Sequence, residues 1–296
     1  MTAPPDELPD EPRRRPALSP SRAGDFKECP LVYRFRAVDR LPERPSRAQV
    51  RGTLVHGVLE RLFDLPAALR DPAAARALVE PVWGALQAAE PGLADVLFPP
   101  GEEDGDGGGG DGDGLAGWLA SAGGLLDAWF ALEDPRLIEP EARELLVEVE
   151  LPSGLPLRGY VDRIDPVPGG GTRVVDYKTG AAPRASGEAR ALFPMKVYAL
   201  ALLHLRGRAP EELHLVYLAS GERWTYRPDA EGLARFAGVL EALWAAVLEA
   251  GATGDFRPSP SRRCDWCSYK PLCPAWGGTP PPYPGWPGSG GAGAAA

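Results

Sequence analysis

The chain has 296 residues, a hydrophobic share of 44% and a formal net charge of −9 at pH 7, and its pI is near 5.0. The length fits one large domain with embellishments, and the acidic balance argues against binding of nucleic acid through overall charge alone. The N-terminus has no apolar segment typical of a secretory signal, and no apolar run approaches the roughly 20 residues that span a bilayer. We therefore expect a cytoplasmic protein that does not bind membranes.

Charged residues are unevenly distributed along the chain. Between residues 99 and 114, acidic residues lie among glycines, which predicts a mobile low-complexity loop. Between Arg13 and Arg51 there are eleven basic residues and four acidic ones. This excess indicates either a solvated charged face or a track for phosphates. The Pro-rich, charged residues 1–16 and the Gly/Pro/Ala-rich residues 277–296 are expected to be disordered.

The first half of the chain is predicted to be helical. Ser19 followed by Pro20 combines a side-chain cap with a proline in the first turn, which predicts a helix that ends near Cys29. An apolar stripe at helical spacing predicts a second helix over residues 52–63, and we expect two more over 72–90 and 115–132. Residues from about 64 to 135, including the acidic loop, would form a helical insert in a domain that spans residues 17–276.

The second half begins with short β-rich segments. Residues 144–151, 155–165 and 172–178 are separated by glycine-containing turns and predict a three-stranded meander. A helix over 194–206, a hairpin of 213–219 with 223–227, and a long amphipathic helix over 229–250 are predicted to follow. This order of helices and strands predicts an α/β domain with a mixed sheet.

Two of the predicted strands carry carboxylates and a lysine. Alternate residues of a strand share a face, so Asp176 and Lys178 point the same way, and Asp162 on the neighbouring strand could project beside Asp176. Phosphodiester hydrolysis uses such groups, because two carboxylates can bind Mg²⁺ or Mn²⁺ and a lysine can orient the attacking water or pair with the phosphate. The spacing Asp-x-Lys alone is common, however, and more often marks a surface ion pair at a strand end.

Longer motifs surround these residues. Residues 159–165 (GYVDRID), 176–180 (DYKTG) and 52–56 (GTLVH) resemble motifs II, III and I of the RecB-like nucleases of the AddB type, in the PD-(D/E)XK superfamily. Residues 18–21 (LSPS) and Cys29 with Pro30 resemble the opening helix of that family. The resemblance covers most of the chain, and it implies a restriction-endonuclease-like core in which a mixed central sheet is flanked by helices.

The resemblance also assigns roles to individual residues. His56, Asp162 and Asp176 would bind the metal, and Asp162, Asp176 and Lys178 would be catalytic. The expected activity is metal-dependent exonucleolytic cleavage of DNA, on single strands or DNA ends, in repair or recombination.

The chain departs from the family pattern at one position. The family commonly has a Gln and a Tyr four residues apart on the helix that follows motif III. Tyr198 stands at the tyrosine position and would take part in catalysis, but Pro194 stands in place of the Gln. We expect Pro194 to lie in the first turn of its helix, where a proline costs little.

Four cysteines form one candidate site: Cys29, far upstream, and Cys264, Cys267 and Cys273 near the C-terminus. Disulfides are not expected in a cytoplasmic chain, so metal binding is favoured, and the local spacing fits either Zn²⁺ or an iron–sulfur cluster. The split pattern is similar to that of the iron–sulfur RecB-like nucleases. That similarity implies a [4Fe–4S] cluster in preference to zinc. The cluster would join the N-terminal segment to residues 258–276.

Two other functions fit the same motifs. One is a weakly active or inactive DNA-end-binding subunit of a helicase–nuclease complex, and the other is a CRISPR-adaptation nuclease. The sequence contains no phosphate-binding G-x-x-x-x-G-K-[ST] loop. Any ATP-driven unwinding would therefore come from a helicase partner.

Overall fold

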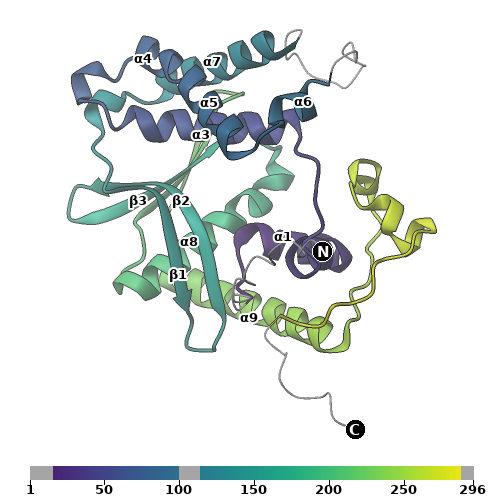
Figure 1. Ribbon diagram of the computed structural model, residues 1–296. Coiled ribbons are helices and arrows are strands. Elements are labelled where there is room, and N and C mark those ends of the chain that lie inside the picture. Colours follow the sequence, from purple (N-terminus) through teal and green to yellow (C-terminus); the bar gives the residue numbers. More distant parts are fainter. Residues whose placement is uncertain (1–15, 100–113, 288–296) are drawn as a thin grey trace, which may run out of the picture. The chain divides into compact units, whose positions relative to one another are not determined.

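The structure is a computed structural model that describes residues 16–99 and 114–287 (Figure 1). The chain divides into two compact units. The sheet unit comprises residues 43–149 and 157–237, and the terminal unit comprises the described part of residues 1–42, 150–156 and 238–296. The predicted acidic loop, apart from its two end residues, and most of the predicted disordered ends lie outside the described residues.

The described part of the sheet unit contains a five-stranded mixed sheet in the order β1-β2-β3-β4-β5. Strands β2 and β3 are antiparallel, β3 and β4 are parallel, and β4 and β5 are antiparallel. The predicted α/β class with a mixed central sheet is therefore confirmed, and the predicted strands lie within a few residues of the observed ones. The strands are β1 (Ala142–Glu150), β2 (Pro156–Val167), β3 (Gly171–Lys178), β4 (Glu212–Tyr217) and β5 (Glu222–Tyr226).

Helices cover both faces of this sheet (Figure 1). Val175 and Tyr177 of β3 pack into a core with α3 (Arg47–Leu62), α5 (Val79–Ala89) and α7 (Gly114–Leu132), whereas Val174 packs on the opposite side with α8 (Glu188–Arg206). This alternation follows from the two-residue period of a strand. Asp176 and Lys178 accordingly project from the same face of β3 as Val174.

Helix α3 (Arg47–Leu62) positions the upstream motif. It begins five residues earlier than the apolar stripe predicts, because Ser46 and Gln49 form a reciprocal capping box that satisfies free N–H groups of the first turn. Leu54, Val58 and other apolar residues of α3 are fully buried. The buried stripe fixes the rotation of the helix about its own axis.

The helix predicted over 72–90 is instead two helices, α4 (Pro72–Ala77) and α5 (Val79–Ala89). Pro81 explains the break at Leu78, because a proline has no N–H to donate to the carbonyl four residues earlier. A short helix, α6 (Leu93–Leu97), follows and had not been predicted.

Helix α7 (Gly114–Leu132) meets the length and composition of a membrane span, which corrects the sequence-based statement that no segment approaches one. Its Trp118 and Trp129 are nevertheless fully buried in the core with α3 and α5. Asp127, near its middle, pairs with Arg76 of α4. We therefore interpret α7 as a core helix.

Helix α8 (Glu188–Arg206) connects β3 to β4 on one face of the sheet. It begins six residues before Pro194, so the expectation that this proline lies in the first turn is wrong. Pro194 lies inside the helix and cannot donate to the carbonyl of Arg190. The helix continues past it because Met195, Ala199 and other apolar residues are buried against the sheet.

The terminal unit is built from short helices and turns. It contains α1 (Pro20–Glu28), α2 (Pro30–Tyr33), a π-helical turn (Arg34–Val38), α9 (Ala230–Thr253) from Gly238 onward, and 3₁₀ turns around the C-terminal cysteines. Ser19 caps α1 as predicted, and its side chain accepts a hydrogen bond from the Arg22 N–H.

Part of the predicted disordered tail is packed against α9. The Tyr283 hydroxyl donates to the Gly251 carbonyl at 2.5 Å, and the rings of Trp286 and Trp244 meet edge to face. The expectation of disorder from residue 277 onward is therefore wrong for residues up to Trp286. These two aromatic side chains bury apolar area that the composition of the segment does not suggest.

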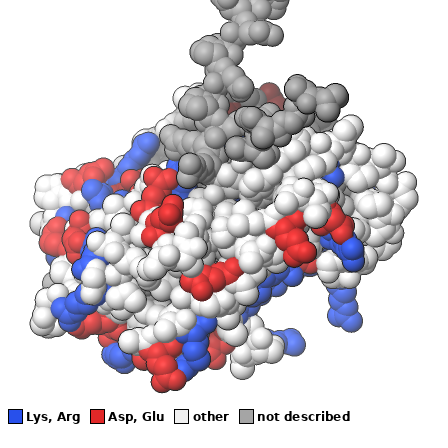
Figure 2. Space-filling view, turned by 90° about the horizontal axis from the view of Figure 1, so that it is seen from below, with Lys and Arg blue, Asp and Glu red and all other residues white. Residues whose placement is uncertain are grey.

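Several arginines of the N-terminal basic segment are structural. Arg34 is buried beside Asp39 and donates to the Pro281 carbonyl, Arg36 pairs with Asp25, and Arg47 donates to Leu97. These three arginines have partners within the protein, and a phosphate track along the segment stays a prediction. On the face of the molecule shown in Figure 2, basic and acidic side chains are intermixed.

Candidate functional site

The candidate active site lies in the sheet unit, where β2 and β3 separate. The last pair in their register is Arg163 with Val175. Beyond it, the Asp162 carboxylate accepts a hydrogen bond from the Tyr177 N–H at 2.7 Å. A side-chain oxygen thus replaces a strand partner, and this bond fixes the Asp162 carboxylate next to Asp176.

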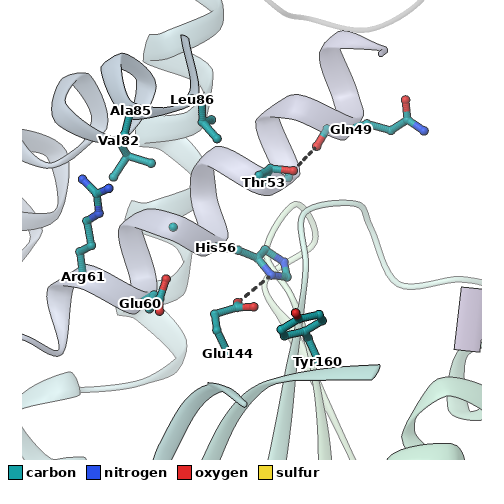
Figure 3. A pocket seen from close by; sticks show the side chains of 12 residues that line it. Gln49, Thr53, His56, Glu60, Arg61, Val82, Ala85, Leu86, Glu144 and Tyr160 are labelled. Atoms are coloured by element: carbon teal, nitrogen blue, oxygen red, sulfur yellow. Dashed lines mark hydrogen bonds and ion pairs between the residues drawn. The ribbon is translucent and has the colours of Figure 1, made fainter. Parts of the chain in front are cut away.

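His56 of α3 reaches this gap between the strands. Its Nε2 lies 3.0 Å from the Tyr177 carbonyl, and its Nδ1 lies 3.5 Å from Asp162 Oδ2. Figure 3 shows the contact of His56 with Glu144, whose Oε1 lies 3.9 Å from Nδ1. Only a protonated Nε2 can donate to the carbonyl. In the neutral imidazole the lone pair is then on Nδ1 and faces the carboxylates, which is the arrangement of a metal-binding histidine held by a backbone acceptor.

Glu144 of β1 completes a group that sequence reasoning missed. One ligand atom each from His56, Glu144 and Asp162 lie within 4.8 Å of one another. The backbone of Glu144 has a φ of 42°, a left-handed conformation that costs a non-glycine residue about 1–3 kcal/mol. The sequence showed only an acidic residue at the start of a predicted strand, and nothing local indicated that this strand end lies beside His56.

Asp176 and Lys178 lie side by side at the end of β3, as predicted. Lys178 Nζ is 2.6 Å from Asp176 Oδ2, and the Asp176 side chain is 6% exposed whereas that of Lys178 is 37% exposed. Asp176 Oδ2 is buried and, apart from this ion pair, has no hydrogen bond of good geometry. Such an oxygen can still accept a further ligand.

Negative charge is concentrated in the site. Burial and the charge of Asp176 raise the pKa of Asp162 to about 7, although His56 and the Tyr177 N–H oppose the shift. Burial lowers the pKa of His56, but its interaction with Glu144 and the charges of Asp162 and Asp176 together outweigh burial and raise it. Burial likewise lowers the pKa of Lys178, and the charge of Asp176 raises it above its ordinary value. The site therefore favours cations.

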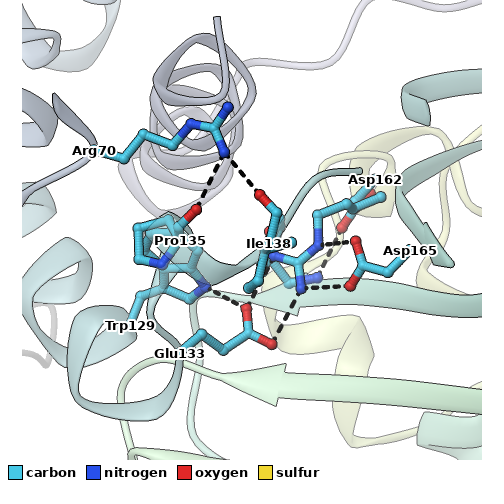
Figure 4. Close-up of polar contacts among 9 residues, drawn as sticks. Arg70, Trp129, Glu133, Pro135, Ile138, Asp162 and Asp165 are labelled. Atoms are coloured by element: carbon cyan, nitrogen blue, oxygen red, sulfur yellow. Dashed lines mark hydrogen bonds and ion pairs between the residues drawn. The ribbon is translucent and has the colours of Figure 1, made fainter. Parts of the chain in front are cut away.

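A buried arginine, Arg163, binds two carboxylates next to the site, Glu133 and Asp165, which are labelled in Figure 4. Arg163 is 1% exposed. It donates two hydrogen bonds to Asp165, at 2.9 and 3.0 Å, two to Glu133, at 2.9 and 3.1 Å, and one to the Tyr177 hydroxyl. Tyr177 lies between Asp176 and Lys178 in the chain, so this clamp fixes the strand that carries them.

A groove of about 640 Å³ opens beside the metal-ligand group. Gly52, Thr53 and Gly57 of α3 lie along it, and α5 forms an apolar wall (Figure 3). His56 and Glu144 also line it. The groove therefore leads directly to the carboxylates.

The four cysteines lie in the terminal unit, and all are half-buried free thiols. Burial raises the pKa of Cys267, the Tyr269 N–H opposes this shift, and charges on Cys29, Cys264 and Cys273 raise it further. The four thiols are thus neighbours. Among the described residues, no three of these sulfurs lie within 4.8 Å of one another.

The aromatic residues beside the cysteines differ in their surroundings. Tyr269 is buried, and its ring centroid lies 5.2 Å from that of Phe35. Its hydroxyl donates a hydrogen bond to the Leu41 carbonyl. Trp266 is 81% exposed. Tyr269 is therefore a packing residue, and Trp266 faces solvent.

Comparison with known proteins identifies the family. A family model described as the PD-(D/E)XK nuclease superfamily matches residues 17–274. The chain belongs to this superfamily. The gene 69 protein of Mycobacterium phage D29 is 25% identical over 295 residues, covering 88% of this chain and 97% of the phage protein.

A solved structure supports the fold of this nuclease. The crystal structure of a protein named putative exonuclease, from Eubacterium rectale, matches with a TM-score of 0.54 and 14% sequence identity. The match covers 86% of this chain and 87% of that chain. At this identity, the likeness shows the shared fold alone.

The residues of this nuclease fit a divalent metal ion. Two carboxylates and an imidazole offer atoms within 4.8 Å of one another, and the buried Asp176 Oδ2 lacks a good hydrogen bond. Oxygen ligands suit Mg²⁺ and Mn²⁺, and an imidazole ligand favours Mn²⁺ over Mg²⁺. The closest group of possible ligands contains Glu144 where the sequence predicted Asp176.

The nuclease also places Tyr198 near the site. Burial raises the pKa of Tyr198, and the charges of Asp176, Asp162 and Glu144 raise it further. Its hydroxyl is therefore neutral and can donate a hydrogen bond. Pro194, one turn earlier on α8, has no donor for the role of the family's Gln.

Proposed function

We propose that this nuclease is a metal-dependent exonuclease of the RecB-like, AddB type that acts on single-stranded DNA or DNA ends in the cytoplasm. The observation that carries the proposal is the group of His56, Glu144 and Asp162 beside the Asp176–Lys178 pair. Membership of the superfamily supports phosphodiester hydrolysis. The name of the Eubacterium rectale protein supports the exonuclease assignment.

Each residue of the site has a role in this proposal. A divalent ion bound there would lower the pKa of its water and neutralise charge on the phosphate. The Tyr177 carbonyl holds Nε2–H of His56, so Nδ1 stays aimed at the metal position. Lys178, with its raised pKa, remains protonated and orients the nucleophile or pairs with the phosphate.

Linear and circular substrates test the exonuclease assignment. With Mn²⁺, we expect end-labelled linear single-stranded DNA to be degraded to short products while a circular single strand of the same sequence survives. Both strands offer the same phosphodiester bonds, so the difference reports the need for an end. Equal cleavage of the circle would show an endonuclease.

We further propose that the four cysteines hold a [4Fe–4S] cluster. The mutual influence of the four thiols on the pKa of Cys267 supports a shared metal group, and the split arrangement of the cysteines along the chain favours the cluster over zinc. The Ser259 and Ser261 N–H groups donate to Cys29 and Cys264, which would stabilise thiolates in that role.

Metal analysis of anaerobically purified protein tests the cluster. We expect brown protein in which iron and acid-labile sulfide each approach four per chain. Colourless protein with one zinc per chain would show a zinc site instead.

One observation favours a second function. Pro194 removes the donor that the family commonly places on α8, which would suit a DNA-end-binding subunit that works beside a helicase with little cleavage of its own. Tight binding of DNA ends without cleavage in either Mg²⁺ or Mn²⁺ would establish that function. Cleavage by the isolated chain would exclude it.

A further inference from the structure

The groove beside the metal-ligand group has a shape and lining that phosphodiester hydrolysis does not itself require. We propose that it holds one unpaired nucleobase of the substrate strand, stacked on Tyr160, next to the scissile phosphate. This inference rests on the proposed function, since it takes the substrate to be a nucleic acid strand. It specifies that the strand is single-stranded at the point of cleavage.

Tyr160 stands at the right place for such stacking. It lines the groove (Figure 3) and is 51% exposed, which is unusual for a large aromatic side chain in a sheet. It lies two residues before Asp162 on β2, so the two side chains share a face of the strand. A base on Tyr160 would therefore be adjacent to a phosphate held at Asp162.

Glycines keep the floor of the groove open. A Cβ added to Gly57 would lie 3.0 Å from Val82 Cγ1, and one added to Gly52 would lie 3.6 Å from Thr179 Oγ1. A side chain at Gly57 would meet α5, and one at Gly52 would meet Thr179, which follows β3. The resulting volume of about 640 Å³ is within the range of small-ligand pockets and exceeds that of one nucleobase.

The charges of the lining select a base over a phosphate chain. Arg61 is the one cation among the lining residues, which also include Glu60 and Glu144. A polyanionic backbone would be repelled there, whereas Val82 and Leu86 of α5 offer an apolar surface to a neutral ring. The backbone would stay at the metal position and at Lys178, and the base would turn into the groove.

Two polar groups near the start of α3 are already bonded within that helix. The Thr53 hydroxyl donates to the Gln49 carbonyl, and Gln49 Oε1 accepts from Ser46 in the capping box. A base stacked on Tyr160 is held through its face, which every base has. Binding by stacking should therefore tolerate all four bases.

Affinity measurements test the proposal without relying on cleavage. All proteins in this test carry Lys178→Ala, so that the DNA strand is not cleaved in Mg²⁺. Binding of a 12-nucleotide single strand is measured from the fluorescence of one 2-aminopurine, which is placed at each position of the strand in turn. We expect Tyr160→Ala in this background to raise Kd roughly tenfold, whereas Tyr160→Phe retains the affinity. Leu205→Ala removes a side chain of similar exposure on α8 and should change nothing.

A modified strand distinguishes stacking on Tyr160 from a general loss of structure. An abasic nucleotide at the position next to the cleaved bond should also raise Kd about tenfold, but it should add nothing in the Tyr160→Ala variant, because both changes remove the same contact. Equal abasic penalties in both variants, or unchanged affinity of Tyr160→Ala, would overturn the proposal. The wild-type chain could also fail to cleave DNA while the abasic nucleotide still weakens binding only when Tyr160 is present. That result would overturn the proposed nuclease activity but support the base-binding site.

Discussion

The sheet unit and the terminal unit hold their functional side chains in different ways. In the sheet unit, Asp162, Asp176 and His56 project from regular strands and a helix, and the Arg163 clamp fixes the strand behind them. In the terminal unit, Cys264 lies on a short 3₁₀ turn, and Cys267 and Cys273 each follow the last residue of such a turn. Strands and a long helix position the first set, whereas local turn hydrogen bonds position the second.

This difference has a physical consequence for each site. The carboxylate site is formed by packing and hydrogen bonds, and its buried charges have partners, because Lys178 pairs with Asp176 and the Tyr177 N–H donates to Asp162. The cysteine segment has little core of its own, so a bound metal group would supply part of its folding free energy. We expect changes in the first unit to affect cleavage and changes in the second to affect stability.

The largest expected effect is on cleavage. Lys178→Ala should lower the rate of DNA cleavage by about 10³- to 10⁴-fold, because it removes the cation next to the metal position. Lys178 is partly exposed, so the far-ultraviolet circular dichroism spectrum should not change. Lys196→Ala on α8 is the matched control and should cleave normally. A Lys178→Ala variant as active as the wild type would show that the site lies elsewhere.

Loss of one cysteine should affect the terminal unit most. Cys264→Ala should lose most of its iron and lower the melting temperature by several degrees, because three thiolates hold the proposed cluster less well. Trp266→Ala changes an exposed residue in the same segment and should retain its iron. Unchanged iron in Cys264→Ala would remove this cysteine from the site.

Removal of the clamp should destabilise the sheet unit. Arg163→Met leaves Glu133 and Asp165 without their cation in a buried position, which should cost about 3–5 kcal/mol in the free energy of unfolding by urea. Arg158→Met, on the same strand, breaks an exposed pair with Glu148 and should cost about 1 kcal/mol or less. An equal decrease in the free energy of unfolding for the two variants would show that the buried arginine stabilises the sheet unit no more than an exposed ion pair does.

A smaller effect is expected from pH. Burial, followed by the charges of Arg173 and Arg223, lowers the pKa of His214 to about 4, whereas an unfolded histidine titrates near 6.5. Between these values the unfolded chain binds more protons, so the free energy of unfolding should fall by about 3 kcal/mol as pH drops from about 6.5 to about 4. Outside this pH range, His214 should contribute no further change to the free energy of unfolding.

His214→Gln tests this contribution. Its free energy of unfolding should fall less steeply than that of the wild type across the same pH window. The exposed His204 provides the control, since His204→Gln should retain the wild-type slope. Parallel slopes in all three proteins would assign the acid sensitivity to other groups.

Local patterns account for the parts of the fold that were predicted. Asp176 and Lys178 share a face because they are two apart on one strand, and that relation can be read from the sequence. The mixed sheet also follows from the order of helices and strands. The superfamily is confirmed by comparison with known proteins.

Contacts between distant residues account for those that were missed. His56 and the Tyr177 carbonyl are 121 residues apart, and Arg163 and Glu133 are 30 apart. Glu144 has no distinguishing local pattern, and its role depends on how the end of β1 meets α3. Pro194 was misplaced because proline is common in a first helical turn, whereas burial of the rest of α8 sustains the helix around it.

The central proposal is that His56, Glu144 and Asp162, beside the Asp176–Lys178 pair, hold a catalytic divalent ion. The most direct test measures Mn²⁺ binding by calorimetry and cleavage of the same end-labelled single strand, for the wild type and for Asp162→Asn. We predict that the wild type binds Mn²⁺ and cleaves only in its presence, and that the variant loses both while its circular dichroism spectrum is retained. Cleavage by Asp162→Asn at the wild-type rate, or cleavage by the wild type in excess EDTA, would contradict the claim.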